Sequence, residues 1–162
     1  MDKDRYRDYI LFLINKDKIN IINHIDIEHY LYGVVPREIP ASSPKEALKA
    51  QVVVARSYAH TSLNNHINEG YNLCNTTHCQ VYGGYDWENS NTNEAVNETY
   101  GEYVSSNGNI VNTPYHSNSG GYTEDSEKVW GGSLPYLVGV EDTYSLNAPN
   151  SSWTVNITPG EL

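Results

Sequence analysis

The sequence predicts an α+β fold, a single domain in which a buried central helix is surrounded by antiparallel hairpins and long polar loops. Three observations support this expectation. The 162 residues are enough for one domain with a sizeable core. Residues 44–60 are apolar at helical spacing, and short strand-like runs elsewhere are joined by turn signals. We therefore expect residues 1–162 to fold as one domain.

The chain is expected to begin with a β-hairpin. Residues 9–14 form an apolar run, which predicts a buried strand. Residues 19–25 alternate well enough to pair back against it. Asp17 and Lys18 supply the turn between the two runs.

A short helix and a turn bounded by prolines should follow. Asp26 is a candidate N-cap for a helix over residues 27–34. This helix delivers the chain to Glu38, which stands between Pro36 and Pro40 in an expected turn.

The central helix has a well-signalled start. Ser43 can cap it, Pro44 suits the first helical position, and Glu46 completes a capping box with Ser43. Apolar residues recur nearly all round the helix, so it should be buried. Its polar residues fall on one stripe opposite the most apolar one, and that stripe comprises Lys49, Arg56 and His60.

The remaining expected elements are short. Apolar periodicity is lost near Asn64, and a polar loop over residues 64–79 holds both cysteines. A further helix, capped by Asn91 or Thr92, should end at Gly101. The other expected features are, in order, a hairpin turn at Asn107-Gly108, a second strand leading to His116, a glycine-rich loop over residues 117–123, and strands near residues 137–140 and 153–157.

Composition narrows the functional classes. The formal charge of -10 argues against nucleic acid or an anionic membrane as the partner. The 14 tyrosines suit a wet groove that stacks against sugars. The sequence contains neither an apolar stretch of membrane-spanning length nor an apolar signal-peptide core. Because the chain starts almost inside its first expected strand and stops soon after its last one, we expect a fragment of a longer exported protein.

Glu38 is the sharpest candidate for a catalytic residue. Its flanking prolines fix the backbone, and apolar neighbours such as Val34 and Ile39 can desolvate the carboxyl group, as a general acid requires. The alternative is an ordinary loop glutamate that pairs with Arg37 or Arg56.

The polar loop carries a possible metal site. Cys74, His78 and Cys79 can supply three tetrahedral zinc ligands, with His66 (or His60) as the fourth. Four protein ligands would close the first shell, which indicates a structural ion. The alternatives are a Cys74–Cys79 disulfide, natural in an exported protein, and two free thiols.

Several separated motifs resemble the stage II sporulation protein D family of peptidoglycan-cleaving lytic transglycosylases. They occur in the family's order and span roughly residues 20–157. The motifs are Tyr30–Pro40, Lys49–Ala59, Gln80–Gly84, His116–Thr123 and Val129–Leu137.

The resemblance implies an activity. Cleavage of the MurNAc–GlcNAc bond in peptide-stripped glycan strands, with a 1,6-anhydro-muramic product, would serve wall remodelling during sporulation and engulfment. An N-acetylmuramoyl-L-alanine amidase is a further candidate partner, and the parent protein would be extracytoplasmic and membrane-anchored. Two alternatives stay open: a non-catalytic peptidoglycan-binding or amidase-activating module, and a zinc-dependent wall hydrolase.

The resemblance also implies roles for individual residues. Glu38 matches the family's catalytic glutamate, and the chemistry requires no cofactor. Lys49 and Arg56 match basic positions that orient this glutamate or bind the lactyl carboxylate of muramic acid, unless they form structural ion pairs with Glu38 or Asp142. The other expected substrate-binding residues are Tyr58, His116, Ser117, Ser119 and Gly120. Some relatives carry zinc in the cysteine loop, and many have a cysteine where Ser119 stands.

Overall fold

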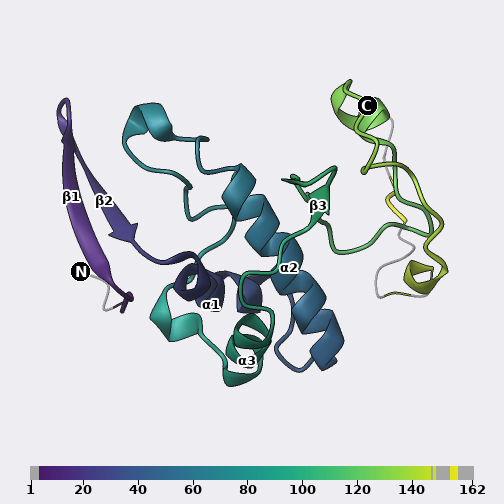
Figure 1. Ribbon diagram of the computed structural model, residues 1–162, viewed down its shortest axis with the longest axis horizontal. Coiled ribbons are helices and arrows are strands. Elements are labelled where there is room, and N and C mark those ends of the chain that lie inside the picture. The colour runs from purple at the N-terminus through teal and green to yellow at the C-terminus, as the bar shows by residue number, and fades with distance from the viewer. Residues whose placement is uncertain (1–3, 147, 149–153, 157–162) are drawn as a thin grey trace. The chain divides into compact units, whose positions relative to one another are not determined.

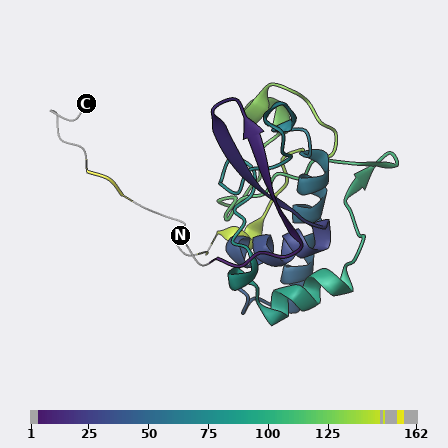
Figure 2. The same ribbon diagram turned by 90° about the vertical axis from the view of Figure 1, so that its left-hand side faces the viewer.

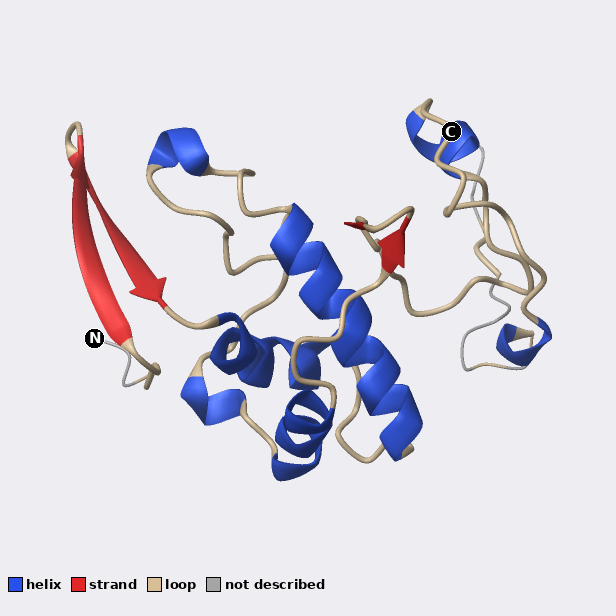
Figure 3. Cartoon of the chain, viewed as in Figure 1, coloured by secondary structure: helices blue, strands red, loops and turns tan. Residues whose placement is uncertain are grey.

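The computed structural model describes residues 4–146, 148 and 154–156, without the side chain of Asn15. The chain separates into two compact units, Met1–Pro114 and Tyr115–Leu162, which are described here one at a time. The regular elements among the described residues are helices and small antiparallel sheets, joined by long loops, and this confirms the predicted α+β class (Figures 1 and 3).

Three helices form the centre of the first unit. They are α1 (Ile27–Glu38), α2 (Lys45–Thr61) and α3 (Ser90–Glu98), which contact one another in all three pairs (Figure 1). Their apolar faces build one core, as expected for helices with an apolar stripe. The buried apolar side chains of this core are Leu31, Val34, Val35, Leu48, Val52, Ala55, Ala59, Ala95 and Val96.

Helix α2 is the predicted central helix, but it begins differently from the expectation. Pro44 occupies the N-cap position in an extended conformation with ψ of 141°, and no side chain caps the helix. The predicted Ser43–Glu46 capping box is therefore wrong. The carbonyl of Pro44 accepts the first helical hydrogen bonds, so the helix starts one residue after the proline.

Helix α1 starts as predicted and runs further than predicted. The side chain of Asp26 accepts a hydrogen bond from the backbone N–H of Glu28 and caps the helix. The helix then continues through Pro36 and ends with Glu38. The prediction that Glu38 stands in a turn between two prolines is therefore wrong. Glu38 is the last helical residue, and Ile39 follows the helix in an extended conformation.

Strands β1 (Tyr9–Asn15) and β2 (Lys18–His24) form the predicted antiparallel hairpin. Figure 2 shows the two strands twisted around each other. The expectation of a buried first strand is wrong, because the described side chains of β1 are exposed and Ile14 keeps 77% of its surface in solvent. A two-stranded sheet buries little by itself, so an apolar run is buried only where another layer covers it.

Short elements complete the first unit. Two 3-10 helices, η1 (Ile67–Glu69) and η2 (Tyr85–Trp87), lie in the loops between α2 and α3. Helix α3 is capped by the side chain of Asn89, earlier than the two predicted caps. Strands β3 (Ser105–Ser106) and β4 (Asn109–Ile110) flank the predicted turn.

The second unit has little regular structure among its described residues. It contains the short helix α4 (Ser126–Trp130), the 3-10 helix η3 (Thr143–Ser145) and an isolated bridge between Tyr122 and Glu141. The predicted strand over residues 137–140 is wrong, and the strand predicted to lead to His116 ends at Ile110. Trp153 and Ile157, the ends of the last predicted strand, lie outside the described residues, and residues 154–156 form no strand.

No helix among the described residues combines the length and the apolar character that crossing a membrane requires.

Candidate functional site

Glu38 presents a carboxylate that has no partner among the described residues. Its side chain is half-buried, and it makes no hydrogen bond or ion pair with any part of the chain that the structure describes. The helix dipole disfavours a negative charge in the last turn of a helix. A lone carboxylate at this position therefore adds nothing to stability, which favours a functional role over the structural pairing with Arg37 or Arg56.

Arg56 forms a buried ion pair in the core of the first unit. Its guanidinium is 0% exposed and grips the Glu28 carboxylate with two hydrogen bonds, of 2.9 Å and 2.7 Å. It also donates to the backbone carbonyls of Glu102 and Val96. Within the first unit, Arg56 thus pairs with Glu28 and not with Glu38, which was one of the alternatives, and full burial leaves the guanidinium no surface on which to meet a glycan.

Lys49 likewise pairs with carboxylates that the sequence had not suggested. Its ammonium lies 2.9 Å from Glu98 and 3.3 Å from Glu46. Hydrogen bonds from Lys45 and Lys49 lower the pKa of the Glu98 carboxyl to about 2. Lys49 therefore contributes to a surface ion-pair network between α2 and α3, and within the described residues of the first unit it does not pair with Glu38.

Tyr58 lies near the cysteine loop. Burial, followed by the negative charge of Cys79, raises the pKa of its hydroxyl. Contact of Tyr58 with a glycan, which the resemblance implies, stays a prediction.

The remaining predicted substrate-binding residues belong to the second unit. His116, Ser117 and Gly120 are exposed, and Ser119 is half-buried. The Ser119 hydroxyl donates to Asp142 over 2.8 Å and lies 2.7 Å from the Ser145 hydroxyl. Within this unit, Ser119 thus fastens the glycine-rich loop to the segment that contains η3.

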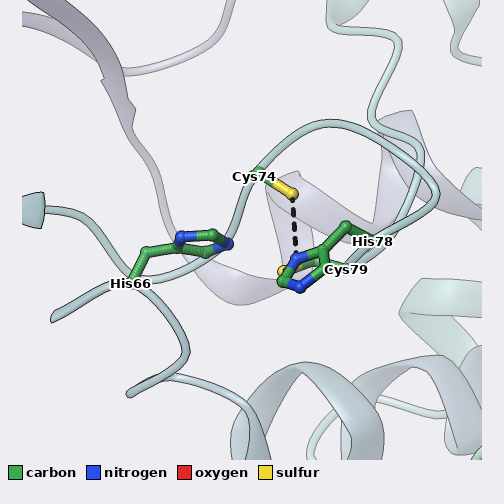
Figure 4. Close-up of side chains that lie close together, drawn as sticks. All are labelled: His66, Cys74, His78 and Cys79. Carbon is green, nitrogen blue, oxygen red and sulfur yellow. Dashed lines mark hydrogen bonds between the residues drawn. The ribbon is translucent and has the colours of Figure 1, made fainter.

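The polar loop brings the four predicted metal ligands together. One ligand atom from each of His66, Cys74, His78 and Cys79 lies within 4.8 Å of the other three. Figure 4 shows these side chains converging on one centre. The Nδ1 atom of His78 is 3.7 Å from the Cys74 sulfur and 3.6 Å from the Cys79 sulfur. Two thiols and two imidazoles form the donor set that zinc prefers.

His66 carries the clearest sign that this cluster fits a metal. Its Nδ1 lies 2.8 Å from the Glu69 carboxylate, which in turn accepts a hydrogen bond from Tyr71. Its Nε2 is buried and has no partner at normal hydrogen-bond geometry among the described residues. A carboxylate on one ring nitrogen leaves the lone pair of the other nitrogen free to ligate, and this arrangement is typical of histidine ligands of zinc. The sequence had offered His66 and His60 as alternatives; His60 instead packs its ring against Tyr103.

Both cysteines are free thiols in the structure. Burial is the largest single influence on the pKa of Cys74 and raises it. Hydrogen bonds from Thr76, His78 and Cys79 outweigh burial and lower the pKa of Cys74 to about 6. Burial raises the pKa of Cys79. The disulfide alternative is therefore not the state that the structure shows.

The comparisons with known proteins agree with the motifs. A model of the stage II sporulation protein family matches residues 15–105, more than half of the chain. The chain belongs to the stage II sporulation protein D family. The residues that match the family model include Glu38 and all four candidate metal ligands.

The family includes relatives with different names. The chain is 46% identical to the amidase enhancer of Bacillus subtilis over 82% of this chain and 17% of the relative. It is 35% identical to an uncharacterized protein of Brachyspira hyodysenteriae over 97% of this chain and 43% of the relative. It is 30% identical to stage II sporulation protein D of Bacillus subtilis over 87% of this chain and 46% of the relative. The chain thus spans less than half the length of these relatives.

Proposed function

We propose that this chain carries the acid–base centre of a peptidoglycan lytic transglycosylase that acts on peptide-stripped glycan strands outside the cytoplasm. The observation that carries the proposal is the half-buried carboxylate of Glu38, which has no partner among the described residues and stands at the end of a rigidly packed helix. Membership of the sporulation protein family supports a role in cell-wall remodelling.

One carboxylate is sufficient for this reaction. Glycoside hydrolases generally need two, one as acid and one as nucleophile or base. In a transglycosylase, the carboxyl group of Glu38 protonates the leaving glycosidic oxygen. The 6-hydroxyl of the muramic acid then attacks the anomeric carbon, and the carboxylate takes the hydroxyl proton. The products are a 1,6-anhydro-muramic end and a shortened strand, with no water consumed.

The mass of the product tests this chemistry. We expect digestion of peptide-stripped glycan strands to release fragments whose ends are one water lighter than those of hydrolysis products. Mass spectrometry of the digest measures this difference directly. Ordinary reducing ends would instead show that water is the nucleophile and would contradict the proposal.

A second function is supported by one specific comparison. A relative with 46% identity to this chain is named an amidase enhancer. On this alternative, the chain binds peptidoglycan and stimulates an N-acetylmuramoyl-L-alanine amidase without cleaving glycan itself. Stimulation of such an amidase by a Glu38→Gln variant that cleaves no glycan would favour this alternative.

We further propose that His66, Cys74, His78 and Cys79 hold a structural zinc ion. Four protein ligands complete a tetrahedral shell and leave no open position for water. Such an ion would stabilise the loop between α2 and η2 and take no part in glycan cleavage. This is also the reason to prefer a structural ion over a zinc-dependent hydrolase.

Removal of zinc should therefore lower the thermal stability of the chain. We expect the purified chain to bind one zinc ion, and we expect a strong chelator to lower its melting temperature. Glu69→Gln should weaken zinc affinity by about 10- to 100-fold, because this carboxylate orients His66. Glu94→Gln, on the exposed face of α3, is the control. A chelated chain that stays fully folded but loses glycan cleavage would contradict the structural assignment.

A further inference from the structure

The two cations that the sequence suggested for carboxylate recognition are already engaged. Arg56 is buried against Glu28, and Lys49 is held by Glu98 and Glu46. A substrate carboxylate therefore needs a different cation. Arg37, the residue before Glu38, is the best placed alternative in this unit.

Arg37 differs from the other arginines that the structure describes. Arg5, Arg7 and Arg56 each pair with a carboxylate. Arg37 is exposed and has no carboxylate partner among the described residues; its guanidinium carbon lies 3.8 Å from the centre of the Trp87 ring. The helix dipole stabilises a positive charge in the last turn of a helix. This effect does not explain why the guanidinium lies over the indole ring, which is a separate cation–π contact.

Trp87 is held firmly although 54% of it is exposed. A Cβ atom on Gly83 would come within 2.5 Å of the Trp87 ring, so the indole packs directly on the backbone at that position. The two neighbours of Trp87 are fixed as well. Asp86 is bound by Arg5, and Glu88 by two hydrogen bonds from Arg7, of 2.6 Å and 2.8 Å. An anchored ring of this kind holds the guanidinium in place before a ligand arrives.

From this geometry we infer that Arg37, positioned on Trp87, binds the carboxylate of an acidic saccharide beside Glu38. A guanidinium that stacks through its face keeps its N–H donors at the periphery, where they match a carboxylate in bidentate fashion. Arg37 and Glu38 are consecutive residues of the last turn of α1, and their side chains leave the helix in different directions, so a ligand that meets both is an extended saccharide and not a single carboxylate. The inference rests on the proposed function, in which the ligand is muramic acid with a free lactyl group. Arg37 is then a specificity-determining residue that explains a preference for strands without stem peptides.

The test compares two glycan probes. One is a peptide-stripped strand with free lactyl carboxylates, and the other is the same strand after conversion of the carboxylates to amides. Binding of both is measured calorimetrically at one ionic strength. We expect the wild-type chain to prefer the charged strand by roughly 10-fold or more, because a charge-assisted hydrogen bond is worth that factor.

Variants identify the source of the preference. Arg37→Gln should bind both strands equally, whereas Lys18→Gln, which removes the same charge from an exposed strand of the hairpin, should keep the preference. Arg37→Lys keeps the charge but loses the planar fork, so it should show an intermediate preference and serves as the second variant if the glutamine variant fails to fold. A wild-type chain without preference, or an Arg37→Gln variant that keeps it, overturns the inference. Because binding needs no turnover, absence of anhydro products together with an intact preference would contradict the proposed function alone.

Discussion

Glu38→Gln is expected to abolish glycan cleavage. An amide cannot protonate the leaving oxygen, and loss of a general acid typically costs a factor of 10² to 10⁴ in rate. We therefore expect the turnover of peptide-stripped strands to fall at least about 100-fold. Because the carboxylate has no partner among the described residues, the exchange breaks no interaction of the folded chain. The free energy of unfolding should change by less than about 0.5 kcal/mol.

Glu46→Gln provides the matched control. Glu46 lies in the first turn of α2, its side chain is 84% exposed, and it makes only a loose ion pair with Lys49. Its exchange should leave turnover and stability unchanged. Release of anhydro products by Glu38→Gln at the wild-type rate would remove Glu38 from the mechanism.

Arg56→Met should produce the largest loss of stability. The exchange leaves the Glu28 carboxylate, only 7% exposed, without its counter-ion, and it removes the donors to two backbone carbonyls. Breaking a buried pair by removal of one partner typically costs about 3 to 5 kcal/mol. Equilibrium unfolding in urea measures this difference.

Two further variants distinguish the effect of breaking the buried ion pair from the effect of removing one positive charge. Lys45→Met removes a cation from the exposed face of the same helix, and its free energy of unfolding should stay within about 1 kcal/mol of the wild type. The double variant Glu28→Met/Arg56→Met leaves no unpaired charge and should be more stable than Arg56→Met alone. An Arg56→Met chain as stable as the Lys45→Met chain would show that the ion pair contributes little.

The features that the sequence predicted correctly depend mainly on neighbours in the chain. The Asn107-Gly108 turn formed because both residues accept a positive φ, of 51° and 78°. The clustering of the four candidate metal ligands was predicted because three of them stand within six residues of one another. Asp26 was found because a cap needs only the amide two residues ahead.

The features that the sequence missed depend on contacts between distant segments. Helical spacing placed Arg56 and Lys49 on one polar stripe, but it carries no information that Glu28 of α1 meets the arginine inside the core. The exposure of β1 escaped prediction for a related reason, since an apolar run does not show whether a second layer covers it. Trp87 gave no signal, because its stacking partner is 50 residues earlier in the chain.

The pairing of Arg5 and Arg7 with Asp86 and Glu88 joins segments 81 residues apart. It closes a large ring in the first unit without a covalent bond. The segment just before the hairpin is consequently tethered to the short helix that carries Trp87. The position of this short helix therefore depends in part on Arg5 and Arg7, which precede the hairpin. The Trp87 ring, over which the Arg37 guanidinium lies, is thus held partly by residues that are distant from it in the sequence.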